Sequence, residues 1–574
     1  MWATTVVVPL VLLIALCMKC AEAQLQGRAL SNDGMTNIPN LKYGLFVHFV
    51  PNLTVNHNGG VVANANTLAN GFDASQFAND LAVAEVQYVV FTSWHANMVA
   101  LWPSDIMLEW DLPDHRVDRD LIGDIIAAVG NKGIRIYLYT HPRDGMQFTD
   151  ADREKTGWGI DNGGAYNPGA DFNRTKWNAF INDIYGELMQ RYGQQIDGLF
   201  MDEGSPQGDS ETVVDYPQLR STIKATNPNA NLIQNDYGNL YGLDMGMKEY
   251  GGWGEFSQPN ESLWPSYAEP VAAIFTETWW AASTTSTIRY SAGSMLRYTA
   301  FQAATNSEGG GITWAAGPYA DSGWEPGVMA TFQQIGSWIS GIHESIFDTR
   351  PSTSYPTKPG TTIGDVSWGS ATKSADDLIE YIHVLKPPAG LTLALPAPRD
   401  GKVFSTGSRL PVSTPVSLSQ NIKGVNITIT GSWDANLTVI RLTVLSRSGP
   451  VPLFRCSNGI HHIDTTDSGC ETSSYSLDGP LGYVHAIQLA GTVPLYRCYS
   501  ASRGDHMDTT DSSCEASSYV LDGVIGYIYQ AQVQDSVPLY RCYSASTEDH
   551  MDTTDASCES SRYYREGVLG YVVV

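Results

Sequence analysis

Cysteine is missing from most of this chain. Of its 574 residues only eight are Cys, and after Cys17 and Cys20 none appears before Cys456. The long segment between them must fold on its own hydrophobic core, without disulfide bonds. The other six form an even set in the last quarter, which predicts disulfides and an oxidising, extracellular environment. They are Cys456, Cys470, Cys498, Cys514, Cys542 and Cys558.

Basic residues are also scarce. The chain has 34 Lys and Arg against 60 Asp and Glu, which gives a formal net charge of −26 at pH 7. Such a charge disfavours nucleic acid and anionic membranes as partners. Beyond the N-terminus no apolar run is long enough to span a membrane. The composition leaves the oligomeric state open.

The first 23 residues contain a long apolar run. A run from Val6 to Cys17 is followed by Ala21-Glu22-Ala23, which is typical of a signal peptide and its cleavage site. The alternative is a membrane anchor, but the run is short for a bilayer. We therefore predict a secreted, extracellular protein, with the lysosome and the extracellular matrix as compatible destinations. Five Asn-x-Ser/Thr sequons fit a glycoprotein: Asn52, Asn173, Asn260, Asn426 and Asn436.

From Tyr43 to Arg350, β-rich apolar runs alternate with helical patterns such as 121–131 and 177–192. This alternation predicts a parallel sheet, and the length fits a (β/α)8-like barrel over residues 24–350. The run that ends at Arg350-Pro351-Ser352 is expected to be the last helix. Only seven strands can be recognised, so one is missed or degenerate. They are 43–50, 86–95, 134–141, 198–202, 231–236, 273–280 and 309–317.

Two all-β regions follow the barrel. Residues 351–447 alternate with turn residues and predict an antiparallel β-sandwich. Residues 448–574 contain three copies of a repeat, which begin at Val451, Val493 and Val537. A unit of this size is too small for a hydrophobic core of its own, so we expect one disulfide within each copy. We also expect the three copies to pack around a pseudo-threefold axis. A trefoil-like fold is one possibility. The expected pairs are Cys456–Cys470, Cys498–Cys514 and Cys542–Cys558.

Polar and aromatic residues gather at the ends of the predicted barrel strands. Active sites of such barrels lie at the C-terminal ends of the strands. Asp202 stands out, because a carboxylate directly after Leu-Phe-Met needs a reason to end a buried strand. Acids among aromatic rings fit a sugar, and two carboxylates complete a glycosidase. A lone histidine in such a place is more often structural. The residues concerned are His48, His95, Tyr139, His141, Asp202, Asn235, Asp236, Tyr237, Glu277, Trp279 and Trp280.

Several short segments, in order, resemble one known family. Tyr43-Gly-Leu-Phe-Val-His48, Ala100-Leu-Trp-Pro-Ser104 and Gly317-Pro-Tyr-Ala-Asp321 are similar to segments of the α-L-fucosidases, glycoside hydrolase family 29. The resemblance covers residues ~38–447. It implies a retaining enzyme that removes terminal α-L-fucose from glycans or glycoproteins by double displacement, with no cofactor and no metal.

The resemblance also implies roles for individual residues. Asp202 falls on the nucleophile. His48 and His95 fall on fucose-binding histidines, and Tyr139 on or beside a substrate-contacting tyrosine. Glu249 falls on a segment that carries the acid/base, on a variable loop, with Glu255 and Glu277 as alternatives. A solvated loop acid is the competing interpretation of Glu249.

Three positions depart from the family. Ala96 stands where the family has a second histidine, and Phe200 replaces a Trp two residues before the nucleophile. Tyr237 stands where an Arg reaches the sugar and the nucleophile, and losing that cation raises the pKa expected for Asp202. Phe200 and Tyr237 are counted with the substrate-binding residues. A catalytically weak or inactive fucosidase-like lectin or matrix protein therefore remains an alternative.

The repeats resemble a Pro-Leu-Tyr-Arg / Asp-His-x-x-Thr-Thr module of unassigned function. Their Asp, His and Thr residues invite a metal interpretation, but turn capping beside a disulfide explains them better. The first copy has His461-His462 in place of Asp-His. Threefold repetition with exposed Tyr predicts multivalent binding of glycans or a surface.

Overall fold

The computed structural model describes residues 41–95, 98–143, 145, 148–160, 168–202, 212–235, 243–250, 261–267, 269–305, 309–421, 423–447 and 449–574. The predicted signal peptide lies outside these ranges. The chain divides into two compact units. One runs to Asp348 and includes Thr362–Gly364, and the other comprises Thr349–Thr361 and Asp365–Val574. No helix within these ranges has the length and apolar character needed to cross a membrane.

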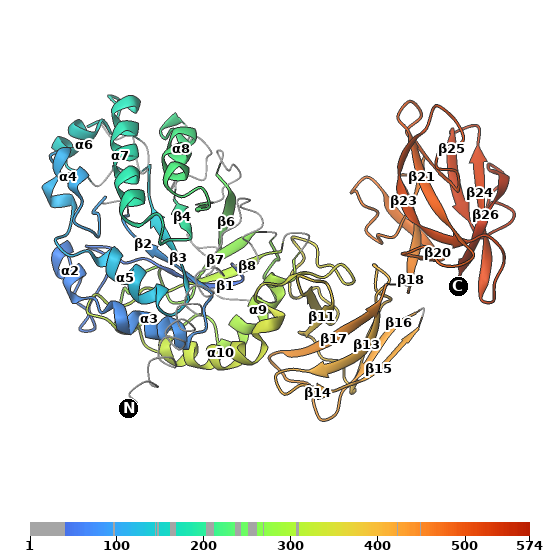
Figure 1. Ribbon diagram of the computed structural model, residues 1–574, viewed down its shortest axis with the longest axis horizontal. Coiled ribbons are helices and arrows are strands. Elements are labelled where there is room, and N and C mark those ends of the chain that lie inside the picture. The colour runs from blue at the N-terminus through green and yellow to red at the C-terminus, as the bar shows by residue number, and fades with distance from the viewer. Residues whose placement is uncertain are drawn as a thin grey trace, which may run out of the picture. The chain divides into compact units, whose positions relative to one another are not determined.

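The first unit is built on a closed barrel of eight parallel strands in the order β1 to β8, which confirms the predicted barrel (Figure 1). Each strand is joined to its neighbour in sequence, and β8 pairs with β1 to close the ring. The strands are β1 (Tyr43–Val47), β2 (Tyr88–Thr92), β3 (Arg135–Thr140), β4 (Gly198–Met201), β5 (Asn231–Asn235), β6 (Met245–Tyr250), β7 (Pro270–Ile274) and β8 (Gly311–Ala315).

The barrel strands are nearly continuous apolar runs because both of their faces are covered. β1, β2, β4, β7 and β8 are buried along their whole length. Close approach between strands depends on glycine at β4. A Cβ at Gly198 would lie 2.0 Å from the carbonyl oxygen of Asn231 on β5. Any larger residue there would push the two strands apart.

Three sequence expectations differ from the structure. The unrecognised strand is β6, whose sequence Met-Gly-Met-Lys-Glu-Tyr contains no β-branched residue. The strand expected at 273–280 is β7, which begins at Pro270 and ends at Ile274, so Glu277 follows it in a loop. Arg350–Pro351 does not end a helix but forms the short strand β9 of the next sheet.

Helices surround the barrel, and most begin at a side-chain cap. Asp73, Asp120, Asn173, Asp215 and Ser291 each accept a backbone N–H of the first turn. The helices are α2 (Ala65–Gly71), α3 (Ala74–Val83), α4 (Asp105–Glu109), α5 (Leu121–Gly130), α6 (Asp150–Thr156), α7 (Arg174–Tyr192), α8 (Tyr216–Thr226), α9 (Ala292–Ala303) and α10 (Val328–Ile342), with 3-10 turns at Pro113–His115, Glu261–Leu263 and His343–Ser345.

Two antiparallel sheets follow, as predicted. One has the order β14-β13-β17-β11-β10-β9 and the other β12-β16-β15. Ile382 and Leu442 of the first share a buried core with Leu393 and Val425 of the second, so the sheets form a sandwich. The strands are β10 (Gly369–Lys373), β11 (Ile379–Val384), β12 (Thr392–Leu395), β13 (Val403–Arg409), β14 (Thr414–Pro415), β15 (Ser417–Asn421), β16 (Gly424–Thr428) and β17 (Thr438–Ser446).

Each repeat forms three antiparallel strands, and the long third strands β20, β23 and β26 pair with one another. This closes a ring with pseudo-threefold symmetry around a shared apolar core. The three disulfides lie within the copies, as predicted: Cys456–Cys470, Cys498–Cys514 and Cys542–Cys558. The strands are β18 (Pro450–Ser457), β19 (His462–Thr465), β20 (Ser476–His485), β21 (Thr492–Ser500), β22 (Asp505–Thr509), β23 (Val520–Tyr529), β24 (Ser536–Ser544), β25 (Asp549–Thr553) and β26 (Tyr564–Val573).

Candidate active site

The candidate site residues continue the rows of side chains that face the barrel interior, at the C-terminal ends of the strands. The barrel interior is filled by buried residues that include Phe46, Tyr139, Phe200, Ile233 and Met247. Successive side chains of a strand point to opposite sides, so the residue two positions further on faces the same interior. The residues reached in this way are His48, His141, Asp202, Asn235 and Glu249.

Asp202 is held by two side-chain donors. Tyr139 Oη donates to its Oδ2 at 2.8 Å, and Asn235 Nδ2 donates to its Oδ1 at 3.1 Å. The same nitrogen lies 3.2 Å from Glu249 Oε2. Because they share this donor, the two carboxylate oxygens lie no more than about 6.3 Å apart, a limit that includes the roughly 5–5.5 Å between the carboxyl groups of retaining glycosidases.

The surroundings of Asp202 favour its ionised form. Burial alone raises the pKa of this carboxyl, but His141, the hydrogen bonds from Tyr139 and Asn235, and His95 outweigh burial and lower the pKa below its ordinary value. This holds although Tyr237 stands in place of the family's arginine. Asp202 is therefore an anion at neutral pH.

His48 and His95 are kept neutral. Burial lowers the pKa of His95 to about 3, with a further contribution from His141 and opposition from Asp202. Burial, His95 and His141 together hold the pKa of His48 well below its usual value. Neutral imidazoles both donate and accept hydrogen bonds, as recognition of sugar hydroxyls requires.

Aromatic rings form one wall of the site. The ring of His48 lies 4.5 Å from that of Tyr139, and the ring of His95 stacks on Tyr139 at 5.4 Å with only 13° between the planes. Half-buried Trp279 packs at 5.5 Å from Phe46. Thr92 Oγ1, 3.0 Å from His48 Nδ1, fixes the orientation of that imidazole. Aromatic rings beside hydrogen-bonding imidazoles are groups that can bind the apolar and the polar parts of a sugar.

The other predicted site residues take different places. Phe200 is 3% exposed and packs beneath the rim, in contact with Phe46 and stacked on Tyr139. Glu277 is exposed, and it accepts a hydrogen bond from the Thr287 backbone at 3.3 Å. Tyr237 and Glu255 lie outside the described residues.

The sequence predicts Asn235 at a strand end but indicates no role for it. Here it contacts both candidate carboxylates. Glu249 was expected on a variable loop, but it lies on β6, next to the last residue of that strand. The period of two from Met245 through Met247 to Glu249 was the available signal. Among the predicted sequons, Asn52, Asn173 and Asn426 are exposed, Asn436 is half-buried, and Asn260 lies outside the described residues.

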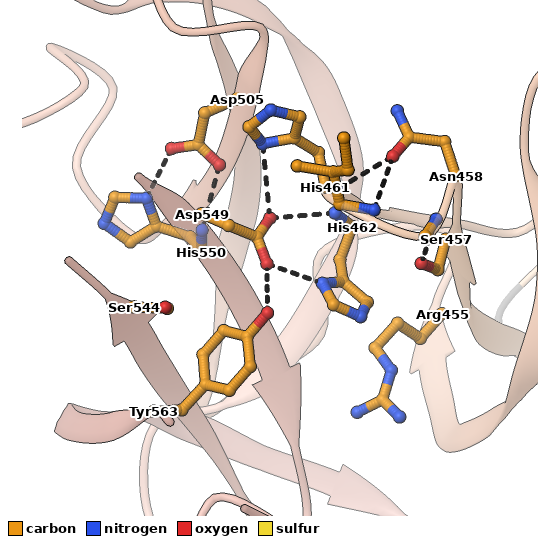
Figure 2. A network of polar contacts seen from close by, with 12 residues as sticks. Arg455, Ser457, Asn458, His461, His462, Asp505, Ser544, Asp549, His550 and Tyr563 are labelled. Carbon is orange, nitrogen blue, oxygen red and sulfur yellow. Dashed lines mark hydrogen bonds and ion pairs between the residues drawn. The ribbon is translucent and has the colours of Figure 1, made fainter. Parts of the chain in front are cut away.

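The repeat domain holds a second polar network (Figure 2). Asp549 accepts hydrogen bonds from the His462 backbone, from His462 Nδ1 at 2.7 Å and from the Tyr563 hydroxyl. Asp505 accepts the matching set from His550 and from Tyr519. In each case the carboxylate of one repeat binds the histidine of the next.

The third copy of this network is incomplete. His461 stands at the position of Asp505 and Asp549, and its Nδ1 lies 3.6 Å from Asp549. His506, the counterpart of His550, is therefore left without a carboxylate from the first repeat. Burial lowers the pKa of His506, whereas the interactions with Asp505 and Glu566 outweigh burial and raise the pKa of His550.

The expected turn caps are present beside these networks. Asp511 accepts the Ser513 backbone N–H at 2.9 Å, and Thr509 Oγ1 accepts that of Asp511 at 3.1 Å. The other aspartates of the Asp-His-x-x-Thr-Thr segment do not cap this turn: Asp505 and Asp549 bind histidines, and Asp464, Asp508 and Asp552 are buried near the axis.

Comparison with curated proteins finds short matches. Tissue alpha-L-fucosidase of Mus musculus is 37% identical over 71 residues, which are 12% of this chain and 16% of that protein. A putative alpha-L-fucosidase of Caenorhabditis elegans is 32% identical over 71 residues, 12% of this chain and 15% of that protein. The chain thus spans about a sixth of the length of these relatives.

Solved structures share the fold over a longer range. An alpha-L-fucosidase of Bacteroides thetaiotaomicron aligns with a TM-score of 0.53 and 16% identity, over 72% of this chain and 94% of its own. Alpha-L-fucosidase isoenzyme 1 of Paenibacillus thiaminolyticus aligns with a TM-score of 0.52 and 17% identity, over 72% and 99%. Residues 453–573 match a domain of unknown function, DUF5648. Residues 63–344 match the alpha-L-fucosidase family, which confirms for this segment the family predicted from the sequence.

Proposed function

We propose that the protein is a secreted retaining α-L-fucosidase that acts on fucosylated glycans. The observation that carries the proposal is the amide of Asn235, which contacts Asp202 and Glu249 at once. One oxygen of each carboxylate therefore lies within about 6.3 Å of the other, which supports double displacement because that mechanism uses carboxyl groups roughly 5–5.5 Å apart. The family match over residues 63–344 supports fucose as the sugar.

In the first step, one oxygen of Asp202 forms a bond to the anomeric carbon as the bond to the leaving oxygen breaks. Glu249 gives its proton to that oxygen. In the second step Glu249 removes a proton from water, which attacks the same carbon and releases Asp202. The neutral rings of His48 and His95 hold the sugar hydroxyls, and Trp279 covers an apolar face.

The test is hydrolysis of an aryl α-L-fucoside by wild type and Asp202→Asn. We expect kcat to fall at least about 10³-fold in the variant, because an amide cannot form the glycosyl ester. Circular dichroism checks that the variant folds. Equal rates in both proteins would exclude Asp202 as the nucleophile, and inactive wild type that still binds fucose would favour the lectin alternative.

The role of Glu249 has its own test. Glu249→Gln should hydrolyse fucosides with a good leaving group nearly as well as wild type in the first step, but lose poor leaving groups, because only these need protonation. Glu277→Gln is the matched control, since Glu277 is exposed and bonded to Thr287. A similar loss for good and poor leaving groups would contradict the assignment of Glu249.

A further inference from the structure

Three aspartates, one from each repeat, meet at the centre of the repeat domain. Asp464, Asp508 and Asp552 occupy equivalent positions on β19, β22 and β25. Each has a carboxylate oxygen within 4.8 Å of those of the other two. Their exposed fractions are only 4%, 5% and 3%. Three carboxylates thus share one buried site on the pseudo-threefold axis.

The hydrogen bonding of these aspartates is incomplete. The Oδ2 atom of each is buried and finds no hydrogen-bond donor among the described residues. A buried acceptor without a donor is costly, and a buried unpaired charge more so. This distinguishes them from Asp505 and Asp549, whose oxygens accept hydrogen bonds from histidine and tyrosine.

The nearby arginines are committed elsewhere. Arg497 binds Glu471 through both terminal nitrogens, at 2.8 and 3.0 Å, and its Nε binds Asp522 at 2.6 Å. Arg455 and Arg541 repeat this pattern with Glu559 and Asp478, and with Glu515 and Glu566. Toward the axis, each arginine donates to the backbone carbonyl of an aspartate and not to its carboxylate.

The charge balance therefore leaves the centre negative. Each repeat contributes one arginine and three acids: its axial aspartate and the two acids that bind arginines. Burial and repulsion from the other axial aspartates hold the pKa values of Asp464 and Asp552 well above their usual range. Burial, with a smaller contribution from Asp522, raises the pKa of Asp508 to about 7, although the arginines and His550 oppose this shift. At neutral pH the site needs either protons or a cation.

We propose that Asp464, Asp508 and Asp552 together bind one divalent metal cation on the axis, with calcium as the preferred ion. Carboxylate oxygens are the ligands of hard cations. Three oxygens arranged symmetrically around one Ca²⁺ at roughly 2.4 Å lie at most about 4.2 Å apart. Those of the three aspartates lie within 4.8 Å of one another, so each needs to move inward by no more than about 0.4 Å to bind the ion. The ion neutralises the centre and ties the three repeats together.

The experiment uses the full chain, dialysed against EDTA and then titrated with Ca²⁺, with Mg²⁺ in parallel. Calorimetric titration should show one site that is lost, or weakened at least about 100-fold, in Asp508→Asn. Exposed Asp535 has a left-handed backbone that Asn also tolerates, so Asp535→Asn is the matched control for lost surface charge and should bind as wild type.

Thermal unfolding provides a second measurement, which does not depend on Ca²⁺ binding by Asp508→Asn. Ca²⁺ should raise the Tm of wild type in the absence of EDTA, and at pH 8 in EDTA Asp508→Asn should be more stable than wild type because repulsion is relieved. Equal Tm of wild type in Ca²⁺ and in EDTA would overturn the proposal. Equal Ca²⁺ affinity of Asp508→Asn and Asp535→Asn would also overturn it, since it would show diffuse binding to an acidic surface.

Discussion

The amide of Asn235 connects the two carboxylates on which the proposed chemistry depends. It donates to Asp202 at 3.1 Å and lies 3.2 Å from Glu249. A hydrogen bond to an ionised carboxylate stabilises the charged form and lowers its pKa. Asn235 therefore positions two groups and tunes one, although it need not touch the reacting atoms.

Replacing Asn235 with Ala removes both effects. We expect kcat/KM for an aryl α-L-fucoside to fall roughly 10- to 100-fold, as for loss of one charge-assisted hydrogen bond. The acid limb of its pH profile should move to higher pH, because the pKa of Asp202 rises when a donor is lost. A lower rate with an unchanged acid limb would show a merely structural role.

At the scale of elements, the repeats give two histidines in nearly identical places opposite pKa shifts. His550 is paired with Asp505, so its pKa is raised and the stability it contributes is lost as pH rises through that pKa. His506 faces the repeat in which His461 replaces the acid, and its pKa is lowered. The stability that the neutral form of His506 contributes is present at higher pH and is lost as pH falls toward this lowered pKa. The two copies therefore respond to pH in opposite directions.

His461→Asp should restore the third network. The new carboxylate can accept from His506, as Asp505 does from His550, and should raise the pKa of His506 above that in wild type. Titration of ¹³C-labelled histidines by NMR follows each ring. Asp505→Asn is the converse control, in which the pKa of His550 should fall. An unchanged titration of His506 in His461→Asp would contradict this explanation of the asymmetry.

The sequence predicted the features that a short stretch of residues encodes, and not the contacts between distant strands. Asp202 and His48 follow apolar, β-rich runs, so their places at strand ends could be predicted. Glu249 could not be placed on a strand, because β6 has neither β-branched residues nor a continuous apolar run. The contact between Asn235 and both carboxylates joins residues from three strands and leaves no local pattern. The disulfide pairs were predictable because the copies repeat.

At the scale of the whole molecule, the disulfides among the described residues all lie in the second of the two units. Scanning calorimetry should therefore resolve separate thermal transitions. A reducing agent should lower only the Tm of a transition that belongs to the C-terminal unit. A 15-residue disulfide loop contributes about 3 kcal/mol in the chain-entropy estimate, so the shift should be large. Cys498→Ser/Cys514→Ser should reproduce part of it. A matching downward shift of the barrel transition would contradict independent folding of the two units.

The cyclic order of contacts in the repeat domain limits how such a domain can arise and change. Arg497 of the second repeat reaches Asp464 of the first, Arg541 of the third reaches Asp508 of the second, and Arg455 of the first reaches Asp552 of the third. Each repeat therefore takes part in two such contacts: its arginine binds one neighbouring repeat, and its aspartate is bound by the other. Deletion of one copy, or addition of a fourth, leaves one such contact that cannot close at the same curvature.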